Sequence, residues 1–351
     1  MTSKERVMAA VSHKAGDRIP CGFVSTPEVD DMLLRHFGAD NMETVLERLG
    51  VDTRPVMPAY IGPTLRTWED GRYQNYWGHI RKAIRNESGT YNESVEFPYA
   101  AFQTVADVEA FAWPKLEWFD FKPITDAING LSEYALILGS TGMMDMINGT
   151  AFGRGTEQVM IDIALEDPVG FACMDKRFEF SYQLLEKGLG VGAGKIDIVW
   201  IGDDFGSQNG LLISPDAWEK LFFPRIRKLC DLIHSHGAKA MLHSCGSTRR
   251  IWPRLIAAGV DIYDTVQPEA FDMEFDSLYA EFGSRMAMHG SMSTQSVLPF
   301  GTPDDVRAVV RARKRTVGSS GGLILAPAHN FQPDTPLENI LAFYDEVCNG
   351  G

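Results

Sequence analysis

A histidine and a cysteine two residues apart, His243 and Cys245, follow the mostly apolar stretch KAML and stand directly before Gly246. In an extended segment, side chains two positions apart point to the same side, so both could reach one ligand. Neutral imidazole and thiolate are ligands that zinc prefers, and a catalytic zinc typically has three protein ligands and an open position. The pair predicts a metal site; a buried thiol beside a hydrogen-bonded histidine is the alternative.

Polar residues that suit the same chemistry follow two other apolar stretches. The pair Asp203 and Asp204 comes after IVWIG, and His329 comes after LILAPA. Adjacent side chains at a strand end point in opposite directions, so one aspartate is expected to face the site as an acid or base, a metal ligand or a histidine partner. The other is expected to cap a helix or form a turn. Both aspartates and His243 are the predicted catalytic residues, and His329 is the predicted third metal ligand.

Four further residues near these chain positions are predicted to contact a substrate. They are Ser140, Gln208, Gln267 and, in the methionine-rich stretch MMDMI, Met144. The glutamines could hydrogen-bond a neutral polar substrate or satisfy nearby backbone groups, and the methionine could line an apolar pocket or fill the core. His289 lies within an expected strand, where a core histidine bonded to the next strand is as good an interpretation as a ligand.

Eight short apolar or β-branched segments alternate with longer segments whose apolar residues recur at three-and-four spacing. The first pattern is typical of strands and the second of amphipathic helices. The alternation predicts an α/β fold, a (β/α)8 barrel formed by one domain of residues 1–351, with the site where the carboxyl ends of the strands meet. An open doubly wound sheet is the alternative, but no glycine-rich phosphate fingerprint follows an early strand. The expected strands are residues 18–23, 53–57, 134–140, 196–204, 238–244, 260–266, 286–291 and 322–327.

Residues 62–125 interrupt this alternation. The aromatic stretch RYQNYWGHIRKAI and the following SGTYNESVEFPYA are expected to form hairpin strands that decorate the barrel. Their tyrosines and tryptophans could line a substrate entrance, but packing against the barrel is the favoured interpretation.

Composition restricts the partners that the chain can have. The net charge of −14 and the lack of long basic runs are unfavourable for binding nucleic acid. No apolar stretch approaches the roughly 20 residues that span a bilayer, so no membrane association is expected. The five scattered cysteines argue against a disulfide framework and for a reducing, cytoplasmic location. A homodimer is compatible with the sequence.

Six segments spread along the chain carry a further signal: KERVMAAVSHKAGDRIP, GDDFGSQNGLLISPDAW, GAKAMLHSCGS, GVDIYDTVQPEA, HGSMSTQSVLPFGTPDDVR and GGLILAPAHNFQPDTPLENI. Through these segments the sequence resembles the uroporphyrinogen decarboxylase superfamily from end to end, and this resemblance implies a (β/α)8 barrel. The superfamily contains both porphyrinogen decarboxylases and cobalamin-dependent methyltransferases, so membership does not fix the chemistry.

The decarboxylase branch fits the sequence poorly. Its members have an MRQAGR-like segment just after the first strand, whereas here VSTPEVDDMLLRHFG follows RIPCGF, with no arginine before Arg35. Its members also have an aspartate after the second strand, which RPVMPAYIG lacks. Uroporphyrinogen has eight carboxylates, which an acidic protein without these arginines is poorly equipped to bind. A decarboxylase of a porphyrinogen or another carboxylated substrate, a carboxy-lyase, is therefore the alternative function.

The methyltransferase branch is nearer. Its zinc-dependent, thiol-methylating members have an H-x-C pair, matched by His243 and Cys245, and a cysteine after the last strand, where this chain has His329. An imidazole in place of a thiolate makes zinc more Lewis acidic, which suits polarisation of an ether oxygen or an amine. The resemblance thus implies a zinc enzyme that demethylates a small donor, such as a methoxylated aromatic compound (O-demethylation). The acceptor would be the corrinoid (cobalamin) of a separate small protein, because the chain lacks the D-x-H-x-x-G corrinoid-binding signature.

Overall fold

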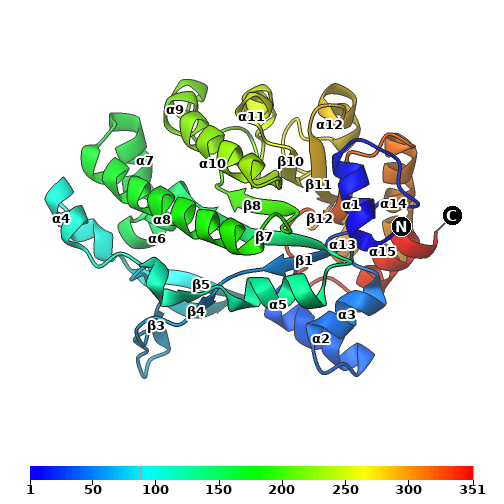
Figure 1. The fold of residues 1–351 in the computed structure, drawn as a ribbon, viewed down its shortest axis with the longest axis horizontal. Helices are drawn as coiled ribbons and strands as arrows, with labels where there is room; N and C mark the ends of the chain where they lie inside the picture. Colours follow the sequence, from blue (N-terminus) through cyan, green and yellow to red (C-terminus); the bar gives the residue numbers. More distant parts are fainter. Residues whose placement is uncertain (87–88, 351) are drawn as a thin grey trace.

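A parallel, curled sheet of seven strands forms the centre of the computed structural model, which describes residues 1–86 and 89–350 (Figure 1). The strands follow one another in the sheet in chain order, so each βα connection returns to the neighbouring position. This arrangement agrees with the predicted α/β, barrel-like fold. The strands are β1 (Thr53–Val56), β7 (Ala135–Met144), β8 (Ile198–Gly202), β9 (Lys239–His243), β10 (Ile262–Val266), β11 (Ala287–Met292) and β12 (Leu323–Pro327).

The first of the eight expected strands, residues 18–23, forms only an isolated parallel bridge between Cys21 and Leu325 of β12. The N–H of Gly22 donates to the carbonyl of Leu325 (3.0 Å), and the N–H of Asp52, just before β1, donates to the carbonyl of Cys21 (2.9 Å). The segment therefore contacts both β12 and the chain that enters β1. Pro20 has no N–H to give to a ladder, which explains why no longer strand forms there.

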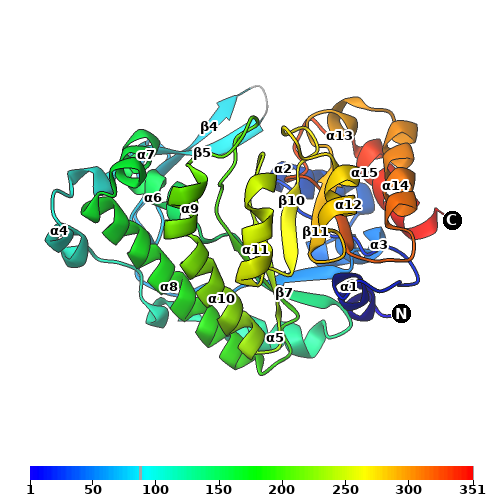
Figure 2. The ribbon, with the colours of Figure 1, turned by 90° about the horizontal axis from the view of Figure 1, so that it is seen from above.

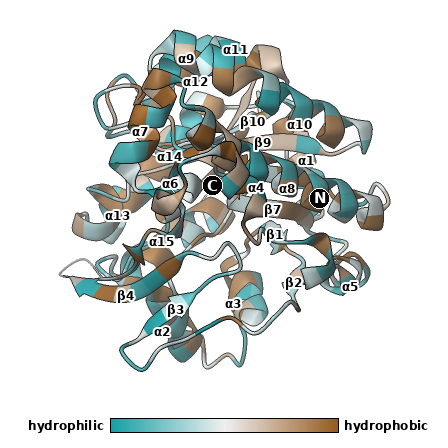
Figure 3. Ribbon diagram, turned by 90° about the vertical axis from the view of Figure 1, so that its left-hand side faces the viewer, coloured by the Kyte–Doolittle hydropathy of each residue, from teal (hydrophilic) through white to brown (hydrophobic). Residues whose placement is uncertain are grey.

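Two hydrophobic layers surround the sheet. The outward-facing strand residues pack under a ring of helices that includes α5 (Lys122–Gly130), α8 (Pro168–Gly192), α10 (Phe223–Ser235), α11 (Trp252–Ala258) and α12 (Phe275–Phe282), with α14 (Pro303–Val317) and α15 (Leu337–Asn349) beside the last strands (Figure 2). The hydropathy of the helices differs from that of the strands. The helices carry both hydrophilic and hydrophobic residues, whereas the enclosed strands are mostly hydrophobic (Figure 3).

The inward-facing layer is closed at one end by the first helix, α1 (Ser3–Val11). Val7 and Val11 of this helix join Ile198, Met241 and Ile262 in one buried cluster inside the sheet. Because α1 fills the interior on this side, the carboxyl ends of the strands are the end at which a site can open. The remaining helices are α2 (Pro27–Phe37), α3 (Met42–Leu49), α4 (Val105–Ala110), α6 (Met146–Arg154), α7 (Thr156–Leu165), α9 (Pro215–Leu221) and α13 (Val297–Phe300).

The region of residues 62–125 contains a small antiparallel sheet of β3 (Arg72–Gln74), β4 (Ile80–Asn86) and β5 (Gly89–Glu96). A second small pair joins β2 (Ala59–Tyr60) to β6 (Phe119–Asp120). Aromatic residues of this region pack against the helical layer, as when the ring of Trp77 meets Phe180 of α8 edge-on at 5.2 Å. Within the described residues, no helix is both long and apolar enough to cross a membrane.

Candidate functional site

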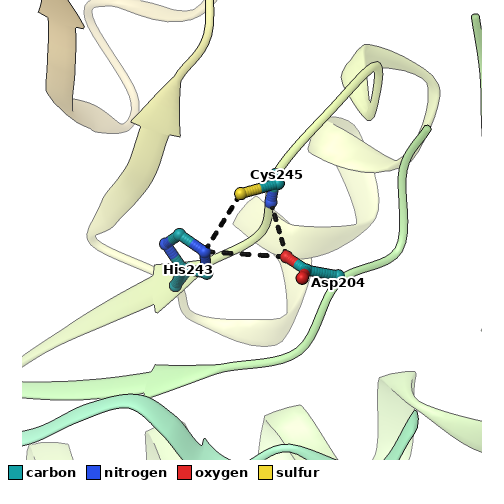
Figure 4. A group of neighbouring side chains, drawn as sticks. All are labelled: Asp204, His243 and Cys245. Carbon is teal, nitrogen blue, oxygen red and sulfur yellow. Dashed lines mark hydrogen bonds and ion pairs between the residues drawn. The ribbon is translucent and has the colours of Figure 1, made fainter. Parts of the chain in front are cut away.

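Three potential metal ligands, Asp204, His243 and Cys245, meet at the carboxyl ends of β8 and β9 (Figure 4). Their ligand atoms all lie within 4.8 Å of one another. The Sγ of Cys245 is 3.4 Å from Nε2 of His243, and Oδ1 of Asp204 is 3.6 Å from the same nitrogen. The backbone N–H of Cys245 donates to Oδ1 of Asp204 (2.9 Å), which fixes this carboxylate beside the pair.

Two glycines allow the loops after β8 and β9 to approach each other closely enough to form this group. A Cβ atom on Gly206 would lie 2.7 Å from the carbonyl oxygen of Cys245, and one on Gly246 would lie 2.6 Å from the carbonyl carbon of Gly206. Gly246 also has a φ of +81°, a backbone conformation that residues other than glycine rarely adopt. The glycine that ends the motif HSCG is therefore required by backbone packing, and this packing brings Asp204 and Cys245 together.

A buried carboxylate on β10, Asp264, holds His243 in place. Its Oδ2 accepts hydrogen bonds from Nδ1 of His243 (2.6 Å) and Nε1 of Trp200 (3.0 Å), and its Oδ1 accepts one from Nδ1 of His289 (2.6 Å). Each of these strand residues lies two positions beyond a member of the inward-facing cluster, so all face the interior. With its Nδ1 bonded to a carboxylate, His243 carries hydrogen on that atom, and its Nε2, once deprotonated, would direct a lone pair toward Cys245 and Asp204.

Asp264 is a site residue that the motifs of the sequence did not indicate. The available signal was its position inside the mostly apolar expected strand VDIYDTV. A carboxylate buried there needs hydrogen-bond donors from neighbouring strands, so it indicates a polar network inside the sheet. His289, for which a core role and a ligand role were both open, is a member of this network.

The surroundings of these groups shift their pKa values in a consistent way. Burial alone would raise the pKa of Asp264, but His289 and His243 outweigh it and hold the pKa below the ordinary value. Burial alone would lower the pKa of His243, but Asp264 and Cys245 raise it well above the ordinary value. Burial raises the pKa of the Cys245 thiol, and hydrogen bonding to His243 offsets part of this rise. A metal cation bound by these side chains would therefore displace protons from them.

The two adjacent aspartates have different positions, as the alternation of a strand end predicts. Asp204 belongs to the three-ligand group, and its Oδ2 accepts a hydrogen bond from the side chain of Asn148 (2.8 Å). Asp203 is 1% exposed, and its carboxylate accepts the backbone N–H groups of Met146 (2.7 Å) and Ile147 (3.1 Å). Those amides lie in the first turn of α6, so Asp203 accepts hydrogen bonds from the free N–H groups at the start of this helix and does not face the three ligands.

Alanine substitutions should separate these two aspartates. We expect Asp203→Ala to lower the free energy of unfolding by about 1–3 kcal/mol, because two buried amides lose their acceptor, and to leave zinc binding intact. We expect Asp204→Ala to weaken zinc binding with a smaller loss of stability. Urea unfolding and a zinc titration of both variants check this. The opposite pattern, with zinc lost only in Asp203→Ala, would contradict the assignment.

Two cavities adjoin the three ligands. The outer cavity, of about 440 Å³, is bordered by Cys245 and His329, and its lining includes Gln208, Gln267, Gln295 and Gln332. The inner cavity, of about 70 Å³, lies inside the sheet and is lined by His243, His289, His329, Trp200 and Asp264, among others. His329 thus borders both cavities, next to the group that Asp204, His243 and Cys245 form. Burial lowers the pKa of His329, which favours a neutral imidazole there.

The predicted substrate contacts are distributed unequally between these cavities and the core. Gln208 and Gln267 line the outer cavity. Met144 is fully buried in the hydrophobic core and does not line either cavity. Ser140 does not line them either. The structure therefore brings the glutamines to the site, whereas the methionine fills space under the strand ends, which was the alternative interpretation of this residue type.

Known proteins with similar sequences or structures agree with this architecture. The family model described as uroporphyrinogen decarboxylase (URO-D) matches residues 92–349. The methylcobamide:CoM methyltransferase MtaA of Methanosarcina barkeri is 27% identical over 147 residues, which span 42% of this chain and 40% of that protein. A solved methyltransferase from Methanosarcina mazei has the same fold, with a TM-score of 0.70, 18% identity and coverage of 99% of this chain and 98% of that chain. These matches confirm the family resemblance that the sequence predicted.

Proposed function

The chain belongs to the uroporphyrinogen decarboxylase (URO-D) family, and from this premise we propose that it moves a methyl group from a small donor to the corrinoid of a separate protein. The proposal is carried by the convergence of Asp204, His243 and Cys245 within 4.8 Å at the strand ends. The partial sequence match to a methylcobamide methyltransferase supports methyl transfer. A methoxylated aromatic compound is the donor that the sequence resemblance suggests.

The side chains present fit a zinc ion. His243, Cys245 and Asp204 offer one nitrogen, one sulfur and one oxygen, all of them atoms that zinc accepts in catalytic sites. The other ring nitrogen of His243, Nδ1, is hydrogen-bonded to Asp264 at 2.6 Å, as is usual for histidines that bind a metal. His329, which borders both cavities, is the further ligand proposed from the sequence. Bound zinc would act as a Lewis acid that makes the heteroatom of the donor a better leaving group.

The residues of the chain itself bind the donor and orient the metal-binding side chains. The outer cavity has room for a small donor whose heteroatom lies next to Cys245 and His329. Asp264 keeps the imidazole of His243 in one tautomer and one orientation. Asp204 is fixed by the N–H of Cys245 and by Asn148, so it holds the two loops in register and can support a ligand. The inner cavity, about 70 Å³, has room for a methyl group or a few water molecules.

A combined metal and transfer assay tests the proposal. The protein is incubated with zinc, freed of excess metal and assayed for zinc content, and then for methyl transfer from a methyl ether to free cob(I)alamin by absorbance. We expect about one zinc ion per chain and methylcobalamin formation that is lost when a chelator removes the metal. A protein that retains no zinc, or that converts uroporphyrinogen to coproporphyrinogen, would contradict the proposal and favour the decarboxylase alternative.

A further inference from the structure

We infer that the methyl donor is an uncharged molecule rich in hydroxyl or amide groups, for example the methyl ether of a polyol, and that the amide side chains of the outer cavity select it. This inference rests on the proposed function, because it assigns the outer cavity to the donor. The cavity borders Cys245 and His329, has a volume of about 440 Å³ and is lined by four glutamine side chains. A volume of this size accommodates a small organic molecule.

Charge in the lining disfavours anionic donors. No lysine or arginine is among the described residues that line the outer cavity, and its lining includes the carboxyl side chain of the exposed Asp334. A carboxylate, sulfonate or phosphate moving into this cavity would lose hydration without gaining a positive partner. The net charge of −14 adds a long-range repulsion. Donors of these classes should therefore bind weakly.

Aromatic surface in the lining is also scarce. Phe300 is the aromatic residue of the outer cavity, and it is 77% exposed at the rim. Recognition of a cationic methylammonium group, or stacking of an aromatic ring, uses the faces of enclosed aromatic side chains. The inner cavity contains Trp200 but measures about 70 Å³, whereas a cavity of about 150 Å³ is needed for a benzene ring. Neither cavity is built for an aromatic or quaternary ammonium donor, so the uncharged polar donor inferred here replaces the methoxylated aromatic compound that the sequence resemblance suggests.

The amides supply what an uncharged polar donor needs. The Oε1 of Gln267 accepts the N–H of Gly246 (2.9 Å), so its NH2 group remains as a donor at this mostly buried position. Gln208 and Gln295 add side chains that can both donate and accept hydrogen bonds. A hydroxyl-rich ligand exchanges its bonds to water for bonds to such amides, and a site of this kind rejects analogues that leave them unpaired.

A matched pair of sugars tests the inference on the zinc-incubated protein. The uncharged ligand is methyl β-glucopyranoside, the anionic one is the corresponding methyl glucuronoside, and 2-methoxyphenol is the aromatic one. We expect isothermal titration calorimetry to give the glucopyranoside an affinity at least about tenfold higher than that of either other ligand. Equal or tighter binding of the glucuronoside or of 2-methoxyphenol would overturn the inference.

Charge variants of the lining sharpen the test. Gln295→Lys should raise the affinity for the glucuronoside by about tenfold, whereas the same change at the exposed Gln103, near the start of α4, should not. Gln267→Glu keeps the acceptor for Gly246 N–H but removes the NH2 donor, so it should weaken binding of the glucopyranoside. Equal effects of the Gln295 and Gln103 variants would overturn the inference.

The two proposals fail in distinguishable ways. If the glucopyranoside binds in the expected order but no methyl ether is demethylated by zinc-loaded protein, the proposed function is wrong and the preference of the cavity stands. If methyl transfer occurs, but from the anionic or the aromatic donor in preference to the uncharged one, the function stands and the inference about the donor is wrong.

Discussion

Replacing Cys245 with serine should lower the affinity of the protein for zinc by about 100-fold or more. Loss of a supporting residue behind a ligand already costs about 10–100-fold, and a serine hydroxyl is a much poorer zinc ligand than a thiolate. The substitution is nearly isosteric, and the N–H of residue 245 still reaches Asp204, so the fold should be retained. Competition with a chromophoric zinc chelator measures the affinity, and methyl transfer to cob(I)alamin should fall in parallel.

A second cysteine provides the matched control. Cys348, on α15, contacts the carbonyl of Leu49 and is no member of the three-ligand group. We expect Cys348→Ser to bind zinc as the unsubstituted protein does. Where Cys245→Ser alone leaves some metal bound, addition of His243→Ala should remove it. Stoichiometric zinc and full methyl transfer in this double variant would contradict the proposed centre.

Much of the site could be predicted because strand geometry is local. The period of two along a strand explains why His243 and Cys245 point toward one ligand position, and why Asp203 and Asp204 diverge. Seven of the eight expected strands form where apolar runs of the sequence occur, and the order of a parallel sheet follows from their alternation with helices. These features depend on residues within a few positions of one another in the chain.

Features that depend on contacts between distant segments could not be predicted in the same way. Asp264 gains its role only because β8, β9 and β11 bring Trp200, His243 and His289 to it. Asp204 joins His243 and Cys245 because the close packing at Gly206 and Gly246 brings two distant loops together, whereas the predicted ligand role of His329 stays a proposal. The expected first strand is reduced to a bridge because Pro20 removes a ladder donor, a local signal that its apolar neighbours outweighed in the prediction.

Replacing Asp264 with asparagine should lower the zinc affinity by about 10–100-fold, because the buried carboxylate supports a ligand and supplies negative charge. The two histidines are bonded to different oxygens of Asp264, and asparagine has one acceptor oxygen, so it can accept the N–H group of one of them only. Two donors, His243 and Trp200, meet at Oδ2, whereas His289 alone meets Oδ1. The asparagine oxygen should therefore occupy the Oδ2 position, with its NH2 group facing Nδ1 of His289.

This arrangement predicts different outcomes for the two histidines. His243 keeps its hydrogen on Nδ1 and its Nε2 available for the metal, so the decrease in zinc affinity reports the loss of the negative charge at residue 264. His289 must instead accept at Nδ1 and carry its hydrogen on Nε2, a tautomer change that NMR of the imidazole nitrogens detects. Asp264→Ala leaves all three donors without their acceptor and should lower the free energy of unfolding by about 3–5 kcal/mol. Unchanged zinc affinity in Asp264→Asn, or a tautomer change at His243 in place of His289, would contradict the assigned role of this carboxylate.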